Sequence, residues 1–264
     1  MFNPTDYDPI DLSIGIEANV ASEPWPPEIE HFDHEAGAAL LAERLQENGF
    51  DIEAADFPEG LGLAWEEISA ITHTATHMDA PWHYGPTVGD DPAMTIDSVP
   101  LEWTMGHAVV LDLTWKEAGS EITPMDIEDQ LAEIGHDLSE GEIVLIETGA
   151  DDLWGQPEYL TEFPGMGAEA TKYLVDQGIR VIGTDAYGFD KPFGAMAARY
   201  SESEDEDELW PAHFAGRDVA YCQIEKMANL DALPRRTDIP IVTQPIKVQD
   251  ASAGWCRPVA FVEQ

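Results

Sequence analysis

Four potential metal ligands lie close together in the first third of the sequence. The segment ITHTATHMDAPWHYG contains His73, His77, Asp79 and His83 in the spacing H-x3-H-x-D-x3-H. Imidazole nitrogens and carboxylate oxygens are the donors that zinc, manganese and iron accept in catalytic sites, where one coordination position stays open. The cluster therefore predicts a catalytic site for a divalent metal ion.

The spacing of the four residues also bears on local structure. All four have odd numbers, so an extended segment would direct their side chains to one side until Pro81 bends the chain. A helix would bring His73 and His77 together but would direct Asp79 away from them. The spacing therefore favours a strand or an extended loop in this segment.

Two residues from the last quarter of the chain could complete the site. His213 lies in WPAHF, and Glu225 follows twelve residues later in CQIEKMANLDALP. Both residue types can bind a divalent ion, so both are candidates to return to the cluster. The other histidines have no such surroundings, and we expect structural roles for His31, His34, His107 and His136.

Apolar strand patterns alternate with helical patterns in the middle of the chain, which indicates an α/β domain. Proline and glycine mark the helix ends, as at Pro124 after the cap Thr123 and at Gly135. We see no long linker and expect one domain over residues 1–264. The expected strands cover residues 10–16, 109–113, 143–146, 180–184, 239–248 and 257–262, the expected helices cover residues 33–47, 124–134 and 168–177, and a solvated acidic loop covers residues 201–208.

The composition excludes several classes of partner. The chain has 264 residues, 44% of them hydrophobic, with 53 acidic against 12 basic side chains and a formal net charge of -41. Nucleic acids and anionic membrane surfaces would repel so acidic a protein, and no run of about 18 apolar residues is present to span a bilayer. We expect a soluble protein that takes a small-molecule substrate and binds neither nucleic acid nor membrane.

The N-terminal residues, the cysteines and the charge bear on location. Residues 1–11 contain three acids and no Lys or Arg, unlike the positive start of a signal peptide. Cys222 and Cys256 are too few for a disulfide framework, so we expect a cytoplasmic protein with reduced thiols. Because molar salt shortens the Debye length to about 3 Å, the dispersed carboxylates also suggest a halophilic protein in a salt-rich cytosol.

The segment HTATHMDAPWHYG resembles the H-x-G-T-H-x-D-x-P-x-H signature of the cyclase-type metal hydrolases, which include arylformamidase (kynurenine formamidase), isatin hydrolase and trans-dienelactone hydrolase. The resemblance extends over most of the chain, through DLS at residues 11–13, GTDAYGFD at residues 183–190 and ANLDAL at residues 228–233. Three positions depart from the family pattern: Ala75 replaces a glycine, Gly188 a serine, and Glu147 stands where arginine is common.

The resemblance implies a set of roles at the site. His73, His77 and Asp79 would be metal ligands, and His213 and Glu225 would complete a site for one or two ions, zinc or manganese. The two carboxylates would bridge the ions. The resemblance also implies a swivelling β/β/α-type fold and a homo-oligomer, a homodimer or a homotetramer.

The same resemblance makes His83 the general acid and base of a hydrolase. A divalent ion lowers the pKa of a bound water from about 15.7 to about 7, so that hydroxide can attack a carbonyl carbon at neutral pH. The sequence has no G-x-S-x-G nucleophile motif. The expected activity is hydrolysis of an amide, cyclic amide or lactone, most similar to arylformamidase, with an isatin or dienelactone hydrolase as the alternative.

Two functions from other classes stay open at this point. His77, Asp79 and His213 also fit the two-histidine, one-carboxylate triad of a non-haem iron oxygenase, although His73 and His83 would then have no role. A metal-binding protein without catalysis would have a closed site, and it would hydrolyse no amide, ester or lactone.

Overall fold

The structure is a computed structural model that describes residues 6–263. Its contacts divide the chain into two compact units, which are described separately. The first unit contains Val20–Pro24, Thr72–Gln264 and the N-terminal segment up to Ile16, and the second contains Glu17–Asn19 and Trp25–Ile71. One domain over residues 1–264 stays a prediction.

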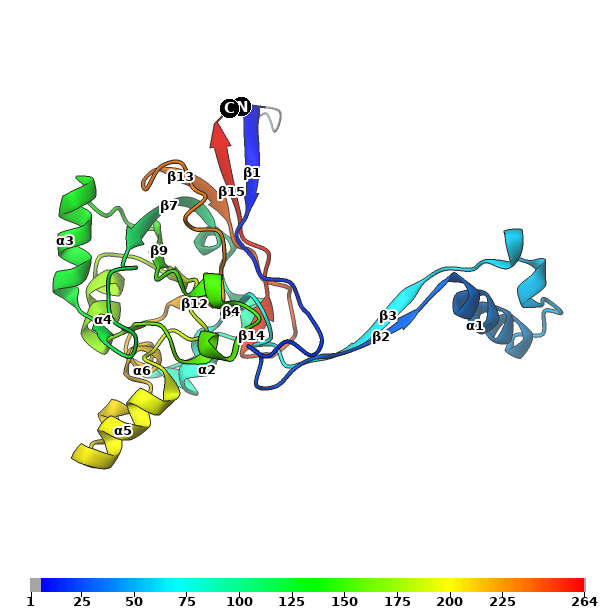
Figure 1. Cartoon of the computed structure of the whole chain (residues 1–264), viewed down its shortest axis with the longest axis horizontal. Coiled ribbons are helices and arrows are strands. Elements are labelled where there is room, and N and C mark those ends of the chain that lie inside the picture. Colours follow the sequence, from blue (N-terminus) through cyan, green and yellow to red (C-terminus); the bar gives the residue numbers. More distant parts are fainter. Residues whose placement is uncertain (1–5, 264) are drawn as a thin grey trace. The chain divides into compact units, whose positions relative to one another are not determined.

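A mixed sheet forms the centre of the first unit (Figure 1). Within the described residues it has nine strands, and its four middle strands run parallel, as expected for an α/β protein. Antiparallel strands continue it on both sides. The order is β1 (Tyr7–Asp11), β15 (Val259–Glu263), β13 (Ile239–Val242), β7 (Met105–Asp112), β9 (Ile143–Glu147), β11 (Val181–Thr184), β12 (Cys222–Glu225), β4 (His77–Asp79) and β14 (Ala253–Trp255).

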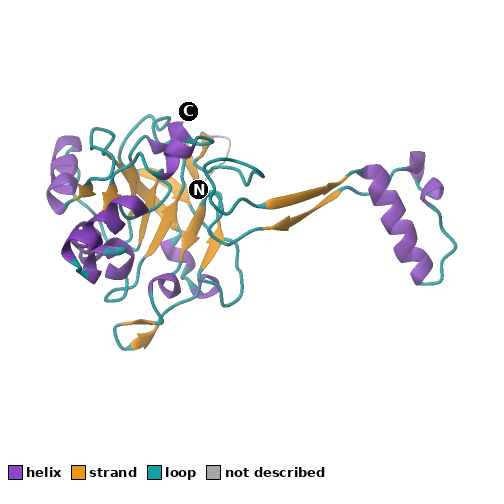
Figure 2. Ribbon diagram, turned by 60° about the horizontal axis from the view of Figure 1, so that its bottom comes forward, coloured by secondary structure: helices purple, strands orange, loops and turns teal. Residues whose placement is uncertain are grey.

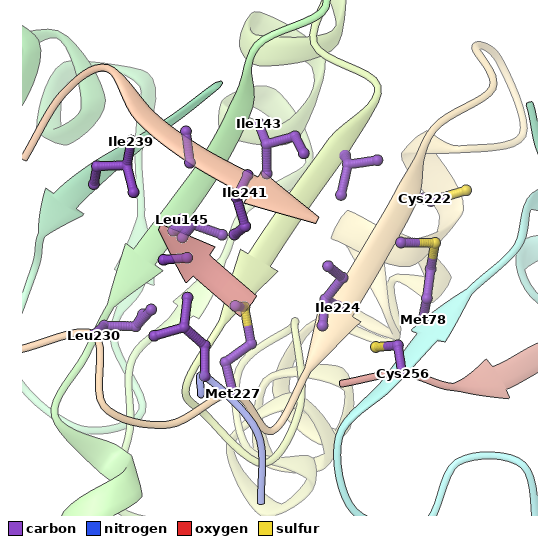
Figure 3. Close-up of a cluster of buried hydrophobic side chains, with 14 of the residues drawn as sticks. Met78, Ile143, Leu145, Cys222, Ile224, Met227, Leu230, Ile239, Ile241 and Cys256 are labelled. Atoms are coloured by element: carbon purple, nitrogen blue, oxygen red, sulfur yellow. The ribbon is translucent and has the colours of Figure 1, made fainter. Parts of the chain in front are cut away.

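The middle strands are buried on both faces. Along β9, Ile143 and Leu145 pack into one hydrophobic cluster, whereas Val144 and Ile146 pack into another on the opposite face. Figure 3 shows part of the first cluster, which we call the first core. The apolar run that predicted a buried strand at residues 143–146 is therefore confirmed.

Helices cover the sheet and follow the predicted end signals (Figure 2). The Thr123 side chain accepts a hydrogen bond from the Asp126 amide at the start of α3, and Gly135 ends the helix in a left-handed conformation. No helix in the described part of the chain is long and apolar enough to cross a membrane. The helices of the first unit are α2 (Pro81–Tyr84), α3 (Pro124–Ile134), α4 (Ala168–Asp176), α5 (Phe193–Ser203) and α6 (Pro211–Ala215).

Short two-stranded pairs accompany the main sheet. One joins β8 (Glu121–Ile122) to β10 (Gly165–Met166), and another joins β5 (Thr87–Val88) to β6 (Asp91–Pro92).

The second unit contains a two-stranded ribbon and a helix. Strands β2 (Glu28–Phe32) and β3 (Trp65–Ser69) pair antiparallel, and α1 (His34–Glu47) follows the cap Asp33, where the expected helix begins. Gly37 of α1 lies against the Leu63 backbone so closely that an added Cβ would sit 2.0 Å from the Leu63 carbonyl oxygen. The buried side chains of α1 are small, so this unit has little hydrophobic core of its own.

Several predicted elements have different bounds in the structure. The strand expected at residues 10–16 is β1, which ends at Asp11, and the one expected at residues 239–248 ends at Val242. Residues 201–208 are solvated as expected, but they are not a loop throughout, since α5 extends to Ser203 and a 3-10 turn covers Glu206–Glu208. Helix formation needs no buried face here, because each residue added to a helix that packing has already started gains a hydrogen bond.

Candidate metal centre

Strand β4 presents two of the predicted ligands on one face of the sheet. His77 and Asp79 are both buried, and Met78 between them packs into the first core on the opposite face. This is the alternation expected of a strand. The aligned side chains bring His77 Nε2 within 3.4 Å of Asp79 Oδ1.

The extended structure predicted around all four residues holds only for β4. His73 lies in a turn, and His83 lies in the short helix α2, which begins at Pro81. Ala75, between His73 and His77, adopts a left-handed conformation with φ at 52°, a backbone state that costs an L-residue about 1 kcal/mol. The four side chains therefore come from a tight turn, a strand and a short helix.

The antiparallel neighbour β12 supplies Glu225. Glu225 pairs with His77 in the register of β4 and β12, and its Oε2 lies 3.6 Å from His77 Nε2. Its other oxygen accepts a hydrogen bond from the Phe189 amide at 2.9 Å. This register brings Glu225 to the cluster, as the sequence analysis expected.

His213 approaches from α6, and a carboxylate that the sequence analysis did not single out fixes its ring. Asp190 accepts hydrogen bonds from the Ala212 and His213 amides at 2.7 and 3.1 Å, and it also binds His213 Nδ1. His213 Nε2 is thereby directed to Asp79 Oδ2, at 3.9 Å, and Glu225 Oε1, at 3.6 Å. Asp190 is the last residue of the GTDAYGFD segment, and this segment is the sequence feature from which its role could have been predicted.

His83 and His73 form the more accessible side of the cluster. Their side chains are 32% and 23% exposed, whereas those of His77 and Asp79 are fully buried. The rings of His73 and His83 lie with centroids 4.2 Å apart. His83 Nε2 is 3.8 Å from Asp79 Oδ2, and His73 Nδ1 is 2.9 Å from Asp79 Oδ1. A substrate would meet these two imidazoles first.

The remaining histidines lie outside this cluster. His107 pairs with Asp238 and His136 with Glu142, while His31 in the second unit pairs with Glu66. Both cysteines are unpaired and buried in the first core, on the face of the sheet opposite His77. The donor set of the centre is therefore nitrogen and oxygen, without sulfur.

The charges of the buried side chains in the centre favour binding of a cation. Burial raises the pKa of Asp79, but the imidazoles of His83, His77 and His73 outweigh it and hold that pKa well below the usual range. Burial and the charge of Asp79 raise the pKa of Glu225. Two carboxylates that repel each other in a buried site would both be stabilised as anions by a divalent ion between them.

The histidines respond to the same charges in different ways. Burial lowers the pKa of His83 to about 4, and the charge of Asp79 only partly offsets this effect, so its ring is neutral at pH 7. Burial also opposes the charged form of His213, but Asp190 outweighs it and raises the pKa to about 9.

The donor atoms fit a divalent ion. Two sets of donors each lie within 4.8 Å of one another: one from His73, Asp79 and His83, and one from His77, Asp79 and Glu225. Among the described residues, His77 Nε2 is buried without a hydrogen-bond partner, a state that costs free energy unless a ligand satisfies it. Ligands about 2.1 Å from a tetrahedral ion lie about 3.4 Å apart, close to the separation of His77 Nε2 and Asp79 Oδ1.

A glutamine that sequence reasoning missed lies beside these donors. The amide nitrogen of Gln223 on β12 is 2.6 Å from His213 Nε2, 3.1 Å from Asp79 Oδ2 and 3.2 Å from Glu225 Oε1. The carboxylates of Asp79 and Glu225 both accept from this amide nitrogen, and the Tyr221 hydroxyl, which donates to the Ala212 carbonyl oxygen at 2.9 Å, lies 3.0 Å from the Gln223 amide oxygen. The Gln223 amide thus fills the space between His213 and the two carboxylates.

The chain matches a known protein family over more than half of its length. Residues 10–191 match the family described as "Putative cyclase". The chain belongs to the cyclase family. The match includes the His73–His83 segment and reaches Asp190 and Lys191 at the end of the GTDAYGFD segment.

Two named enzymes are similar in sequence to this cyclase-family protein. A kynurenine formamidase of Erythrobacter litoralis is 26% identical over 201 residues, which cover 76% of this chain and 78% of that enzyme. An isatin hydrolase of Roseibium aggregatum is 27% identical over 225 residues, 77% of each chain. Both relatives are hydrolases, and this similarity supports a hydrolase here rather than an oxygenase.

The fold of this family member is shared with a solved structure. An isatin hydrolase bound to the product analogue thioisatinate superimposes with a TM-score of 0.76 over 98% of this chain and 94% of that chain, at 19% sequence identity. The expected fold class, a mixed α/β protein of the cyclase type, is therefore confirmed.

Proposed function

We propose that this protein is a metal-dependent amidohydrolase that cleaves the C–N bond of an aryl amide, as an arylformamidase does. The observation that carries the proposal is the convergence of two donor sets on Asp79, with the buried and unpaired His77 Nε2 among them; the sets are His73, Asp79 and His83, and His77, Asp79 and Glu225. The sequence similarity to a kynurenine formamidase supports the substrate class.

A bound zinc or manganese ion would supply Lewis acidity and a water molecule with a pKa of about 7. His73, His77, Asp79 and Glu225 would hold it. His83 lies at the accessible side of the centre, 3.8 Å from Asp79 Oδ2. In that position His83 accepts a proton from the nucleophilic water and delivers it to the departing nitrogen, so that water and amide become carboxylic acid and amine.

We propose one ion per chain. The Gln223 amide nitrogen lies within hydrogen-bond distance of His213 Nε2, Asp79 Oδ2 and Glu225 Oε1, the donors that a second ion would use. His77 Nε2, in the other donor set, has no such competing group. His213 would then contact Gln223 and would not bind the ion itself.

Ring opening of a cyclic aryl amide is the second candidate activity, supported by the 27% identity to an isatin hydrolase. Formamide, cyclic amide and lactone all present a carbonyl carbon to the same nucleophile. The deciding experiment is a hydrolysis panel with N-formylkynurenine, isatin and a dienelactone, with manganese or zinc at high salt. Turnover of N-formylkynurenine that chelator abolishes is the expected result, and failure on all three would reject the proposal.

We propose a homo-oligomer, a dimer or a tetramer, that takes a small-molecule substrate and no nucleic acid or membrane. Large apolar side chains of the second unit support association, since Trp25 is 65% and Leu63 71% exposed. Two unpaired cysteines agree with a cytoplasmic location. Light scattering at high salt tests the oligomeric state, and a monomer would contradict it.

A further inference from the structure

An ion pair lies buried next to the metal centre without belonging to it. Lys226 Nζ is 2.7 Å from Glu23 Oε1, and their side chains are only 4% and 3% exposed. Burial of two charges costs free energy that their mutual attraction repays only in favourable geometry, and similar apolar residues often stabilise a fold as well. The contacts of this pair therefore indicate a role other than stabilising the fold.

Glu23 reaches the turn that carries the metal ligands. The same oxygen, Oε1, accepts a hydrogen bond from the Ala75 amide at 2.8 Å. Ala75 is the residue held in a left-handed conformation, and its carbonyl oxygen lies 2.9 Å from His77 Nδ1. Glu23 thus acts through Ala75 on the ring whose other nitrogen, Nε2, faces the centre.

Lys226 holds the other end of the same turn. Its Nζ donates to the His73 carbonyl oxygen at 3.0 Å, and it lies 4.8 Å from the centre of the Tyr187 ring. Its backbone is also left-handed, with φ at 58°, and its carbonyl oxygen accepts a hydrogen bond from the Thr76 hydroxyl. Since Lys226 directly follows Glu225, it connects a ligand on β12 to the turn before β4.

We propose that Glu23 and Lys226 are positioning residues that hold the 73–76 turn, so that His73 and His77 face Asp79 and Glu225 before a metal ion binds. This inference rests on the proposed metal site. The pair fixes both ends of the turn, one through the Ala75 amide and one through the His73 carbonyl. Without it, Ala75 would relax from its strained conformation and displace both imidazoles.

The test replaces the pair with apolar residues of similar size. In Glu23→Leu/Lys226→Met no buried charge is left unpaired, and both contacts to the turn are lost. We expect the dissociation constant for manganese to rise about 10- to 100-fold, the loss typical of groups that orient metal ligands. In the metal-free protein, amide hydrogen exchange over residues 72–78 should become faster.

A milder variant guards against loss of folding. Glu23→Gln/Lys226→Met keeps an oxygen that can accept from the Ala75 amide and removes only the contact to His73, so its affinity should be intermediate. Glu142→Gln is the matched control, because Glu142 is also a buried glutamate that accepts from a backbone amide, that of Ser139, and contacts a basic side chain, His136. The control should lower the melting temperature and leave manganese affinity unchanged.

A third substitution tests whether the pair acts through the conformation at position 75. Glycine adopts left-handed conformations without steric cost, so Ala75→Gly in the Leu/Met background should recover several-fold of the lost affinity. The same substitution in the native chain should leave affinity unchanged. No recovery would show that the pair does not act through this turn.

The outcomes separate this inference from the proposed function. If the native protein binds neither manganese nor zinc, the proposed function fails, and the exchange over residues 72–78 still decides whether the pair holds the turn. Native metal binding with unchanged affinity and unchanged exchange in Glu23→Leu/Lys226→Met would overturn the inference alone.

Discussion

His77 and Glu225 face each other across the antiparallel strands β4 and β12, with His77 Nε2 and Glu225 Oε2 3.6 Å apart. One strand belongs to the histidine-rich segment and the other to the last quarter of the chain. A shift of the register by one residue would turn Glu225 to the first core and remove it from the centre. The sheet register is therefore what assembles the ligand set.

Protein purified without chelator should carry about one equivalent of zinc, manganese or iron per chain, because a filled single catalytic site needs one ion. Removal of the ion should lower the melting temperature, since a ligand at 100 times its dissociation constant stabilises the native state by about 2.7 kcal/mol. Elemental analysis and thermal melts before and after EDTA measure both effects. Less than about half an equivalent, with a melt that EDTA does not change, would contradict the metal site.

His83→Ala and Asp79→Ala should have different effects on metal binding. Loss of the proton-transfer group should lower kcat about 10²- to 10⁴-fold while the ion stays bound. Asp79 contacts four imidazoles, those of His73, His77, His83 and His213, so its loss should remove both the metal and turnover. Metal content and kcat of the two variants provide the comparison. An empty site in His83→Ala would make His83 a ligand, and full activity would exclude it as the proton donor.

Gln223→Ala should allow a second ion to bind. The substitution removes the amide that lies between His213 Nε2 and the carboxylates of Asp79 and Glu225, so those donors become available. Titration with manganese should show one ion per chain in the native protein and two in the variant. Two ions in the native protein would show that the Gln223 side chain moves aside, and the proposed single site would be wrong.

Stability should increase with salt. The 53 acidic side chains repel one another against only 12 basic ones, and neutralising counter-charges near the surface are few, so screening should stabilise the folded state. Thermal melts from dilute buffer to molar KCl measure this effect. A melting temperature that stays constant or falls over this range would refute the halophilic hypothesis.

Local features of the fold could be predicted from the sequence because their causes are local. The cap Thr123 and the stop Gly135 define α3, and Asp33 begins α1, because each signal acts within one helical turn. The parallel strand β9 follows from its unbroken apolar run. Where a helix extends beyond its packed part, as α5 does to Ser203, composition alone predicted a loop and was wrong.

In the metal centre, too, some features follow from the sequence and others only from the tertiary structure. The sequence by itself placed His77 and Asp79 on one face, because alternation along a strand is a property of the backbone. Tertiary structure alone decided that Gln223 reaches the same donors as His213, that Asp190 fixes the His213 ring, and that Glu23 holds Ala75. These contacts join residues far apart in the chain. The register of β12 and β4 places Gln223 opposite Asp79, whereas Asp190 and Glu23 reach their partners from loops, whose path the sequence pattern does not define.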